Sequence, residues 1–246
     1  MPTLATAEYI INTACQELGL PPVSLASAAN DPTGFQALGL LNALGEELVK
    51  IQDWQFLEKT MGFVGDGVAE SFPMPVDFGR QVNQTEWNVS NRRPMMGPDS
   101  PQMWAWNKFG IVSVGVYFRY RILDNMYTIY PVPGTGVEFV LYYISKDWVR
   151  DGTSSDPQNP NYLDRIIHAT DTPLFDRRLM ISGLKCKLWS QKGFDTTKLE
   201  QEYSYNLATE KAQNAGAAVI NLSGGNNRVL LDWNNVPDGT YYGTSM

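Results

Sequence analysis

The sequence contains few of the residues on which catalytic and metal sites usually depend. Among 246 residues there is one histidine, His168, and there are two cysteines, Cys15 and Cys186, far apart along the chain. A single histidine argues against a multi-histidine metal site and against a Ser-His-Asp triad, so we expect His168 to be structural. The cysteines show no CxxC spacing and no disulfide framework, so we expect buried free thiols.

Motifs for nucleotide binding, secretion and membrane spanning are absent as well. There is no GxxxxGK[ST] motif and no strand-linked GxGxxG. The longest apolar run, Val137 to Ile144, is interrupted by Glu138 and is far shorter than the roughly 20 residues that cross a bilayer. The first residues lack a basic segment followed by an apolar run. We therefore expect no cofactor, no secretory signal and no membrane association.

The charge balance is acidic, with 26 acidic against 19 basic side chains and a net charge of −7. Proteins that grip nucleic acid normally present a basic face, so tight DNA binding is disfavoured. An acidic lining would suit a passage through which DNA slides without sticking. The 43% hydrophobic content is sufficient for a folded core.

Helical patterns occupy the N-terminal segment. One face of the stretch from Leu4 to Leu18 is apolar, and Gly19 follows it. A cap at Asn30 or Asp31, with Pro32 after it, predicts a second helix that ends near Trp54 to Leu57. Its apolar stripe consists of Leu38, Leu41, Leu44, Leu48 and Ile51.

Helical patterns return near the C-terminus. Thr172 and Pro173 predict the start of a helix that Gly193 ends. Thr197 and Glu200 have the spacing of a capping box for a further helix that runs on to Gly216.

The middle of the chain has the composition of β-strands. Residues 117–121, 126–130 and 138–145 are rich in β-branched and aromatic residues, and turns at Asp124-Asn125 and Pro133-Gly134 separate them. They predict consecutive antiparallel strands that form at least a three-stranded meander.

Together these patterns predict an α+β fold. Each helical pair is too small to bury a core alone, so residues 1–57 and 171–216 are expected to form one antiparallel helical bundle. An antiparallel β module, residues 58–150, is then inserted in the bundle, and residues 151–170 form a loop. Residues 217–246 are expected to form an extended C-terminal arm.

That arm is unusually apolar for a terminal segment. It contains Val229, Leu230, Leu231, Trp233, Tyr241 and Tyr242. We expect it either to contact a neighbouring subunit or another protein, or to add a strand to a sheet of its own chain.

Residues 78–106 contain three of the seven tryptophans. Trp87, Trp104 and Trp106, with carboxylates near them, are candidates for stacking on sugars and cleaving them. The carboxylates are Asp77, Glu86, Asp99 and Asp124. We favour instead tryptophans that fill the seam between the β module and the helices, and carboxylates in solvated turns.

The same stretch contains Arg92 and Arg93, followed by Pro94. These arginines could contact DNA phosphate or pair with acidic side chains of a neighbouring subunit. Aromatic and basic residues do not alternate around them, so intersubunit contact is the better prediction.

The order of these parts resembles the head-to-tail adaptor proteins of short-tailed bacteriophages, also called connector or tail tubular A-like proteins. The motifs that carry the resemblance are LLNALGEELVKIQDWQF, TEWNVSNRRPMMGPDSPQMW, YRILDNMYTIYPVP and YYISKDWV, which together span much of the chain.

The resemblance implies a non-enzymatic virion protein at the head-tail interface, assembled in the host cytoplasm as a homo-oligomeric ring, commonly of twelve copies. Its implied partners are the portal protein and the tail nozzle protein, with tail fibres as a further candidate. Double-stranded DNA would pass through the ring during ejection without specific binding. The alternative function is a carbohydrate-binding or polysaccharide-degrading tail component.

Overall fold

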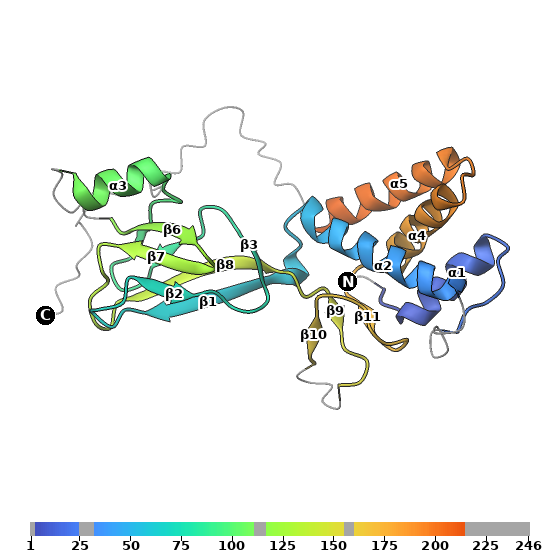
Figure 1. Cartoon of the computed structure of the whole chain (residues 1–246), viewed down its shortest axis with the longest axis horizontal. Coiled ribbons are helices and arrows are strands. Elements are labelled where there is room, and N and C mark those ends of the chain that lie inside the picture. Colours follow the sequence, from blue (N-terminus) through green and yellow to red (C-terminus); the bar gives the residue numbers. More distant parts are fainter. Residues whose placement is uncertain (1–2, 25–31, 111–116, 155–159, 215–246) are drawn as a thin grey trace, which may run out of the picture. The chain divides into compact units, whose positions relative to one another are not determined.

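The computed structural model describes residues 3–24, 32–110, 117–154 and 160–214, and it combines α-helices with antiparallel β-sheets (Figure 1). This confirms the mixed helix and antiparallel sheet content predicted from the sequence. The predicted cap at Asn30 or Asp31, and the arm at 217–246, lie outside the described residues.

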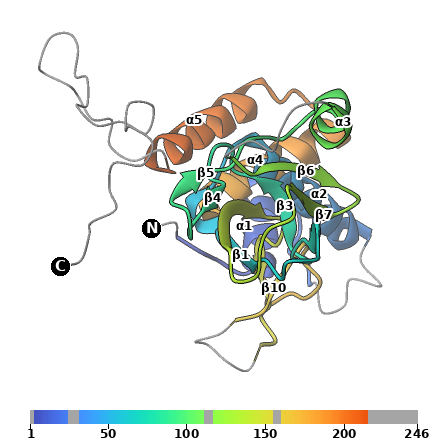
Figure 2. The same cartoon turned by 90° about the vertical axis from the view of Figure 1, so that its left-hand side faces the viewer.

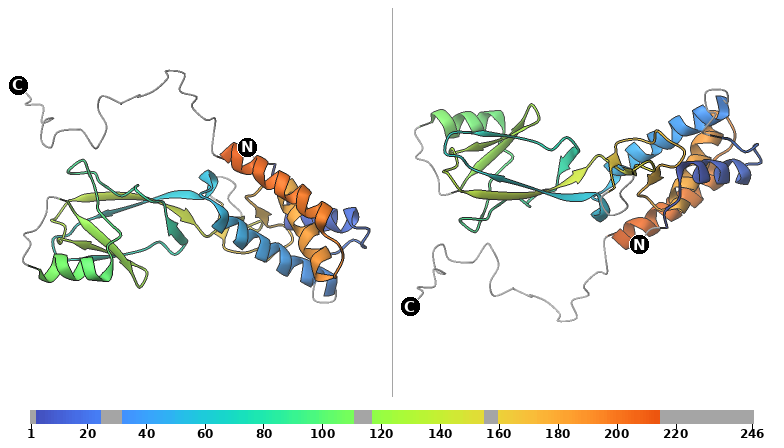
Figure 3. Two further views of the ribbon diagram at one scale, coloured as in Figure 1. Left: turned by 90° about the horizontal axis from the view of Figure 1, so that it is seen from above. Right: turned by 90° about the horizontal axis from the view of Figure 1, so that it is seen from below.

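Four of the helices pack on one another, with α4 in contact with the other three (Figure 3). They are α1 (Ala7–Glu17), α2 (Pro32–Ile51), α4 (Arg177–Gln191) and α5 (Thr197–Asn214). Their shared apolar cluster includes Ile10, Ile11, Leu41, Leu44, Leu48, Leu179, Leu184 and Leu188. Helices from both ends of the sequence therefore contribute to one core.

Backbone hydrogen bonds join the two ends of the sequence beside this core. The Ala7 N–H donates to the Asp171 carbonyl over 2.8 Å, and the Arg177 N–H donates to the Thr3 carbonyl over 2.9 Å. The start of α1 is thus tied to the segment that leads into α4.

Two antiparallel sheets face each other in the middle of the sequence. The first contains β1 (Glu58–Val64), β3 (Phe78–Gln81), β4 (Trp87–Asn88), β5 (Arg93–Pro94) and β8 (Glu138–Ser145). The second contains β2 (Ser71–Pro73), β6 (Arg119–Leu123) and β7 (Met126–Tyr130). Their inward residues form a second core with Met61, Phe63, Tyr120, Tyr127, Ile129, Phe139, Leu141 and Tyr143.

Smaller elements complete the described structure. A 3-10 helix, Gln55–Leu57, follows α2, and helix α3 (Pro101–Phe109) lies between β5 and β6 in sequence. A three-stranded sheet is formed by β9 (Val149–Arg150), β10 (Tyr162–Leu163) and β11 (Thr172–Pro173). The predicted loop at 151–170 thus contains a short strand.

The predicted three-stranded meander is wrong in its last connection. Strands β6 and β7 do form a hairpin, whose turn residues Asp124 and Asn125 have φ angles of 50° and 60°. Strand β8, however, pairs with β1 over seven residue positions in the opposite sheet. Pro131 and Pro133 follow β7 and have no N–H to continue its ladder, so the chain leaves that sheet before β8 begins.

The predicted start of α4 is also wrong. Thr172 and Pro173 form strand β11, and α4 begins only at Arg177, after Asp176 accepts a hydrogen bond from the Arg178 N–H. Helix α5 begins at Thr197 as predicted, but the expected pairing of Thr197 with Glu200 is replaced by other contacts. The Thr197 N–H donates to Asp195, and the Thr196 hydroxyl donates to Glu200.

Helix α2 follows its predicted stripe with one exception. Leu41, Leu44 and Leu48 are fully buried, but Ile51 is 38% exposed because the helix ends there. The chain instead buries Trp54, whose indole N–H donates to the Leu48 carbonyl over 2.7 Å.

Candidate functional site

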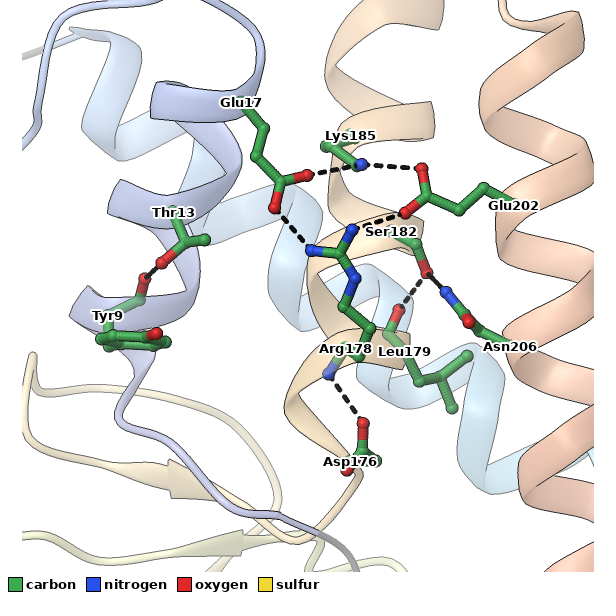
Figure 4. A network of polar contacts seen from close by, with 10 residues as sticks. All are labelled: Tyr9, Thr13, Glu17, Asp176, Arg178, Leu179, Ser182, Lys185, Glu202 and Asn206. Carbon is green, nitrogen blue, oxygen red and sulfur yellow. Dashed lines mark hydrogen bonds and ion pairs between the residues drawn. The ribbon is translucent and has the colours of Figure 1, made fainter.

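Four charged side chains join α1, α4 and α5 in a closed network (Figure 4). The Lys185 ammonium lies 2.7 Å from Glu17 Oε2 and 2.8 Å from Glu202 Oε2. Arg178 contacts the other oxygen of each of these glutamates. Two positive charges therefore balance two negative charges, with the Lys185 side chain only 6% exposed.

The electrostatics of this network favour the charged forms of Glu17, Arg178 and Lys185. Burial acts to raise the pKa of Glu17, but hydrogen bonds from Lys185 and Arg178 outweigh it, so the pKa lies below its ordinary value. Burial likewise opposes the charge on Lys185, yet the two glutamates raise its pKa. Groups whose pKa values are shifted further from neutral pH are poor proton donors or acceptors, so the network is not suited to acid-base catalysis. Its contacts instead hold α1, α4 and α5 in place.

Below the network, a neutral contact continues the link between α4 and α5. The Asn206 side-chain amide donates to Ser182 Oγ over 3.1 Å, and Ser182 Oγ donates to the Leu179 carbonyl (Figure 4). Polar contacts therefore join α4 and α5 along more than one helical turn.

A second polar joint connects α2 to strand β3 through Arg80. Its guanidinium donates to the carbonyls of Val49 and Gln52, over 2.8 and 2.5 Å, and to the Asp53 carboxylate over 2.9 Å. These acceptors lie at and just after the C-terminal end of α2, where unpaired helix carbonyls favour a cation. Arg80 therefore ties the sheet to the helices.

The candidate carboxylates are each engaged in local structure. Asp77 accepts hydrogen bonds from Lys59, Tyr143 and Ser145, and despite partial burial these bonds lower its pKa. Asp124 lies in the hairpin turn between β6 and β7. Asp124 is exposed in its turn as the sequence favoured, whereas the Asp77 side chain is only 17% exposed and is not a solvated carboxylate.

Glu86 and Asp99 differ from the prediction because they are buried rather than solvated. Glu86 accepts a 2.5 Å hydrogen bond from the Tyr120 hydroxyl, and burial together with Glu86 raises the pKa of Tyr120. Asp99 binds the Arg119 guanidinium through both carboxylate oxygens, at 2.8 and 2.9 Å. These partners come from strand β6, and nothing in the sequence around Glu86 or Asp99 indicates them.

The three candidate tryptophans do not fill a seam with the helices, so that prediction is wrong. Trp87 is on β4 and is 40% exposed, and Trp106 is on α3 and is 57% exposed. Trp104, also on α3, packs edge-on against Tyr130 of β7 at 6.2 Å between ring centroids. The tryptophans that enter the helical core are Trp54 and Trp148.

Two features of the sequence could have indicated those buried tryptophans. Trp54 follows the apolar stripe of α2 directly, and Trp148 lies between the apolar strand β8 and Val149. The facing partner of Trp148 is Gly45 of α2, where the absence of a side chain makes room for the indole ring.

Arg92 and Arg93 lie at the turn between β4 and β5. Arg92 is exposed and has a φ of 53°, and the Arg93 guanidinium lies 5.8 Å from the centroid of the Tyr117 ring. Their positions are compatible with contact to another molecule.

The remaining candidates have structural surroundings or lie outside the described residues. His168 is exposed, and its backbone N–H donates to the Asp171 carboxylate. Cys15 is buried as expected, whereas Cys186 is only half-buried, and neither forms a disulfide. The arm residues lie outside the described part of the chain; they are Val229, Leu230, Leu231, Trp233, Tyr241 and Tyr242.

Searches of the described ranges and comparisons with known proteins add no chemistry. Within the described residues, no cluster of histidine, cysteine and acidic side chains is arranged to hold a metal ion, and no helix is long and apolar enough to cross a membrane. No family model matches the chain, and a search of curated proteins finds no significant match.

Proposed function

We propose that this chain is a structural virion protein that forms a head-to-tail adaptor ring between a phage portal and its tail nozzle. The ring would be non-enzymatic and would form part of the conduit for DNA ejection. The observation that carries the proposal is the single core made by α1, α2 and α4, which come from both ends of the sequence. It supports a helical bundle with an inserted β module, the order of parts on which the resemblance rests.

Two polar networks support a role in which the chain keeps a fixed shape. The balanced network around Lys185 holds α1, α4 and α5 together, and Arg80 fastens strand β3 to the end of α2. An adaptor must keep its shape while DNA under pressure passes it, and fixed joints between its elements meet that requirement.

The proposal assigns the C-terminal arm to contact with the portal or a neighbouring subunit. Replacing Leu231 and Trp233 together by alanine should weaken binding of the chain to the portal ring by at least about tenfold, since buried aromatic anchors often contribute 2 kcal/mol or more. Cosedimentation with purified portal measures this. Unchanged binding would eliminate the arm as the portal contact.

Arg92 and Arg93 are assigned to contact between subunits. Replacing both with glutamate should reduce ring formation on the portal, because acidic partners on the next subunit would then repel them. Negative-stain microscopy of the portal mixed with each variant shows whether rings close. A normal ring from the double variant would remove these arginines from the interface.

A carbohydrate-binding tail component remains the second candidate because Trp87 and Trp106 are substantially exposed. Aromatic rings of this kind stack on sugars. Titrating the purified chain with host polysaccharide, while following tryptophan fluorescence and release of reducing ends, separates the two functions. Saturable binding or cleavage, without portal binding, would favour the carbohydrate reading.

A further inference from the structure

Helix α3 is held firmly to the second sheet although none of its residues is fully buried. Asp99, just before the helix, binds Arg119 of β6 and accepts a hydrogen bond from Asn107 of α3. At the other end of α3, Lys108 pairs with Glu70 at 2.6 Å. The helix is therefore fixed by these polar contacts together with the packing of Trp104 on Tyr130.

Three other apolar residues of α3 point outward. Met103, Trp106 and Phe109 recur at every third position and are 45%, 57% and 84% exposed. Residues at this spacing lie on neighbouring positions of one helical face. We call these three residues the α3 patch. A rigidly held helix that exposes its large apolar side chains is typical of an interaction surface.

The first sheet exposes a second apolar surface on its outer face. Side chains alternate along a strand, and Phe139, Leu141 and Tyr143 of β8 face the core, so Val140 and Tyr142 face outward. The strand pairing places Gly62, Val140, Trp87 and Pro94 in one row across this face. Trp87 and Tyr142 are 40% and 39% exposed. We call Val64, Trp87, Val140 and Tyr142 the sheet patch.

The two patches lie on opposite sides of the paired sheets. Trp104 of α3 packs on Tyr130, and Asp99, just before α3, binds Arg119. Tyr130 and Arg119 alternate with the inward residues Ile129 and Tyr120 and so face away from the core. Figures 1 and 2 accordingly show α3 beyond β6, on the side away from β1. Because the two patches are on opposite sides, the α3 patch of one copy can contact the sheet patch of the next copy.

We propose that the α3 patch of one copy docks on the sheet patch of the next copy. Different surfaces on opposite sides produce a head-to-tail contact, which closes into a ring when the rotation between copies allows it. This inference rests on the proposed function, because it names the surfaces through which the adaptor ring would close. Neither patch belongs to the arm or to the arginine pair.

Charge supports a second copy as the occupant. Glu58 and Glu138 are exposed on the outer face of the first sheet, beside the sheet patch. Arg119 and Arg121 of β6 and Lys108 of α3 lie on the side of the α3 patch, where Asp99 and Glu70 only partly balance them. The two glutamates on one side and the excess of one positive charge on the other attract each other between copies.

The size of the patches predicts a weak contact. Fully buried aromatic side chains contribute about 150 to 250 Å² each, so the exposed parts of both patches together bury on the order of 700 Å². Stable complexes bury roughly 1,200 Å² or more. The contact is therefore expected to need high concentration, or the portal as a template, to persist.

A cross-linking experiment with mixed full-length chains tests the proposal. One chain carries Gln102→Cys, which adds a thiol beside the α3 patch, and the other carries Thr60→Cys, which adds one beside the sheet patch; both positions are exposed. Both chains also carry Cys186→Ser, and Cys15 stays because it is fully buried. The mixed chains are treated with a short bismaleimide in two samples. One sample contains the chains alone at high protein concentration, and the other contains them with the portal ring.

Head-to-tail docking predicts that the mixture forms cross-linked dimers severalfold more than either chain alone. Adding Trp106→Ser and Phe109→Ser to the first chain should abolish the product, whereas Phe35→Ser, at a 71% exposed position on α2, should not. Circular dichroism checks that each variant is folded. Equal cross-linking of either chain with itself would show like surfaces meeting, and no cross-linking in any mixture would also overturn the proposal.

The same samples separate this proposal from the proposed function. Portal binding without the mixed product would overturn the docking of the two patches and leave the adaptor reading in place. The mixed product without portal binding would contradict the adaptor proposal and support the docking of the two patches.

Discussion

Replacing Lys185 with methionine is expected to lower the free energy of unfolding by about 2 to 3 kcal/mol. The substitution keeps the length of the side chain but leaves Glu17 and Glu202 facing each other without the ammonium that lies 2.7 and 2.8 Å from them. Both carboxylates are about one third exposed and Arg178 remains, so water and the guanidinium limit the loss. Urea unfolding followed by circular dichroism measures the change.

Lys187 provides the matched control on the same helix. It pairs with Glu47 at the same 2.7 Å, but its partner's side chain is 57% exposed. Lys187→Met should therefore cost less than about 1 kcal/mol. Equal losses from the two variants would contradict the role given to the buried network.

The effect of Lys185→Met on the free energy of unfolding should depend on pH in a definite direction. The pKa of Glu17 in the folded chain lies below its ordinary 4.5, so its contribution is fully present above that pH and is lost as the pH falls through the lower, folded value. Lys185→Met removes much of that contribution. The difference between wild type and variant should therefore shrink as the pH falls below about 4.5.

Replacing Gly45 with alanine is expected to destabilise the chain by about 3 kcal/mol, because a larger residue in a filled core forces its neighbours to move. A Cβ at this position would lie 2.1 Å from Cη2 of Trp148, whose side chain is 1% exposed and stacked among other core residues. The indole ring cannot retreat without opening the contact between α2 and the segment after β8. Thermal and urea unfolding of the purified variant measure the loss.

Gly39 of the same helix separates packing from helix propensity. A Cβ there would meet no atom within 4 Å. Gly39→Ala should raise stability by up to about 1 kcal/mol, since alanine is the better helix former. If Gly45→Ala also stabilised the chain, the close fit between Gly45 and Trp148 would be disproved.

The sequence predicted local structure well where a single segment decides it. Strands 126–130 and 138–145 were predicted with the bounds that the structure has, and the turn at Asp124-Asn125 adopts the conformation that these residues favour. The apolar stripe of α2 was correct apart from its last residue. The spacing of apolar residues and the presence of turn-forming residues are local properties, so they can be read from a single segment.

Features that depend on distant partners were not predictable in the same way. The pairing of β8 with β1 joins residues about eighty positions apart, and nothing within residues 126–145 alone indicates it. The burial of Glu86 and Asp99 depends on Tyr120 and Arg119, which follow later in the sequence. The Lys185 network joins three helices, and only its members' charges are visible in the sequence.

The two apolar patches show why the predicted location of three tryptophans, in a seam between the β module and the helices, was wrong. Trp87, Trp104 and Trp106 are close in sequence, which suggested one shared location. A strand and a helix on opposite sides of the paired sheets carry them, so proximity in sequence did not become proximity in space.

Particle mass tests the central claim most directly. Mass photometry would be applied to the purified chain, to the portal ring from the same virus, and to their mixture. The adaptor proposal predicts a discrete new species whose mass equals the portal plus a closed ring, since cyclic symmetry fixes the number of copies, and the resemblance implies about a dozen. An intact portal whose mass does not change in the presence of excess folded chain would contradict it.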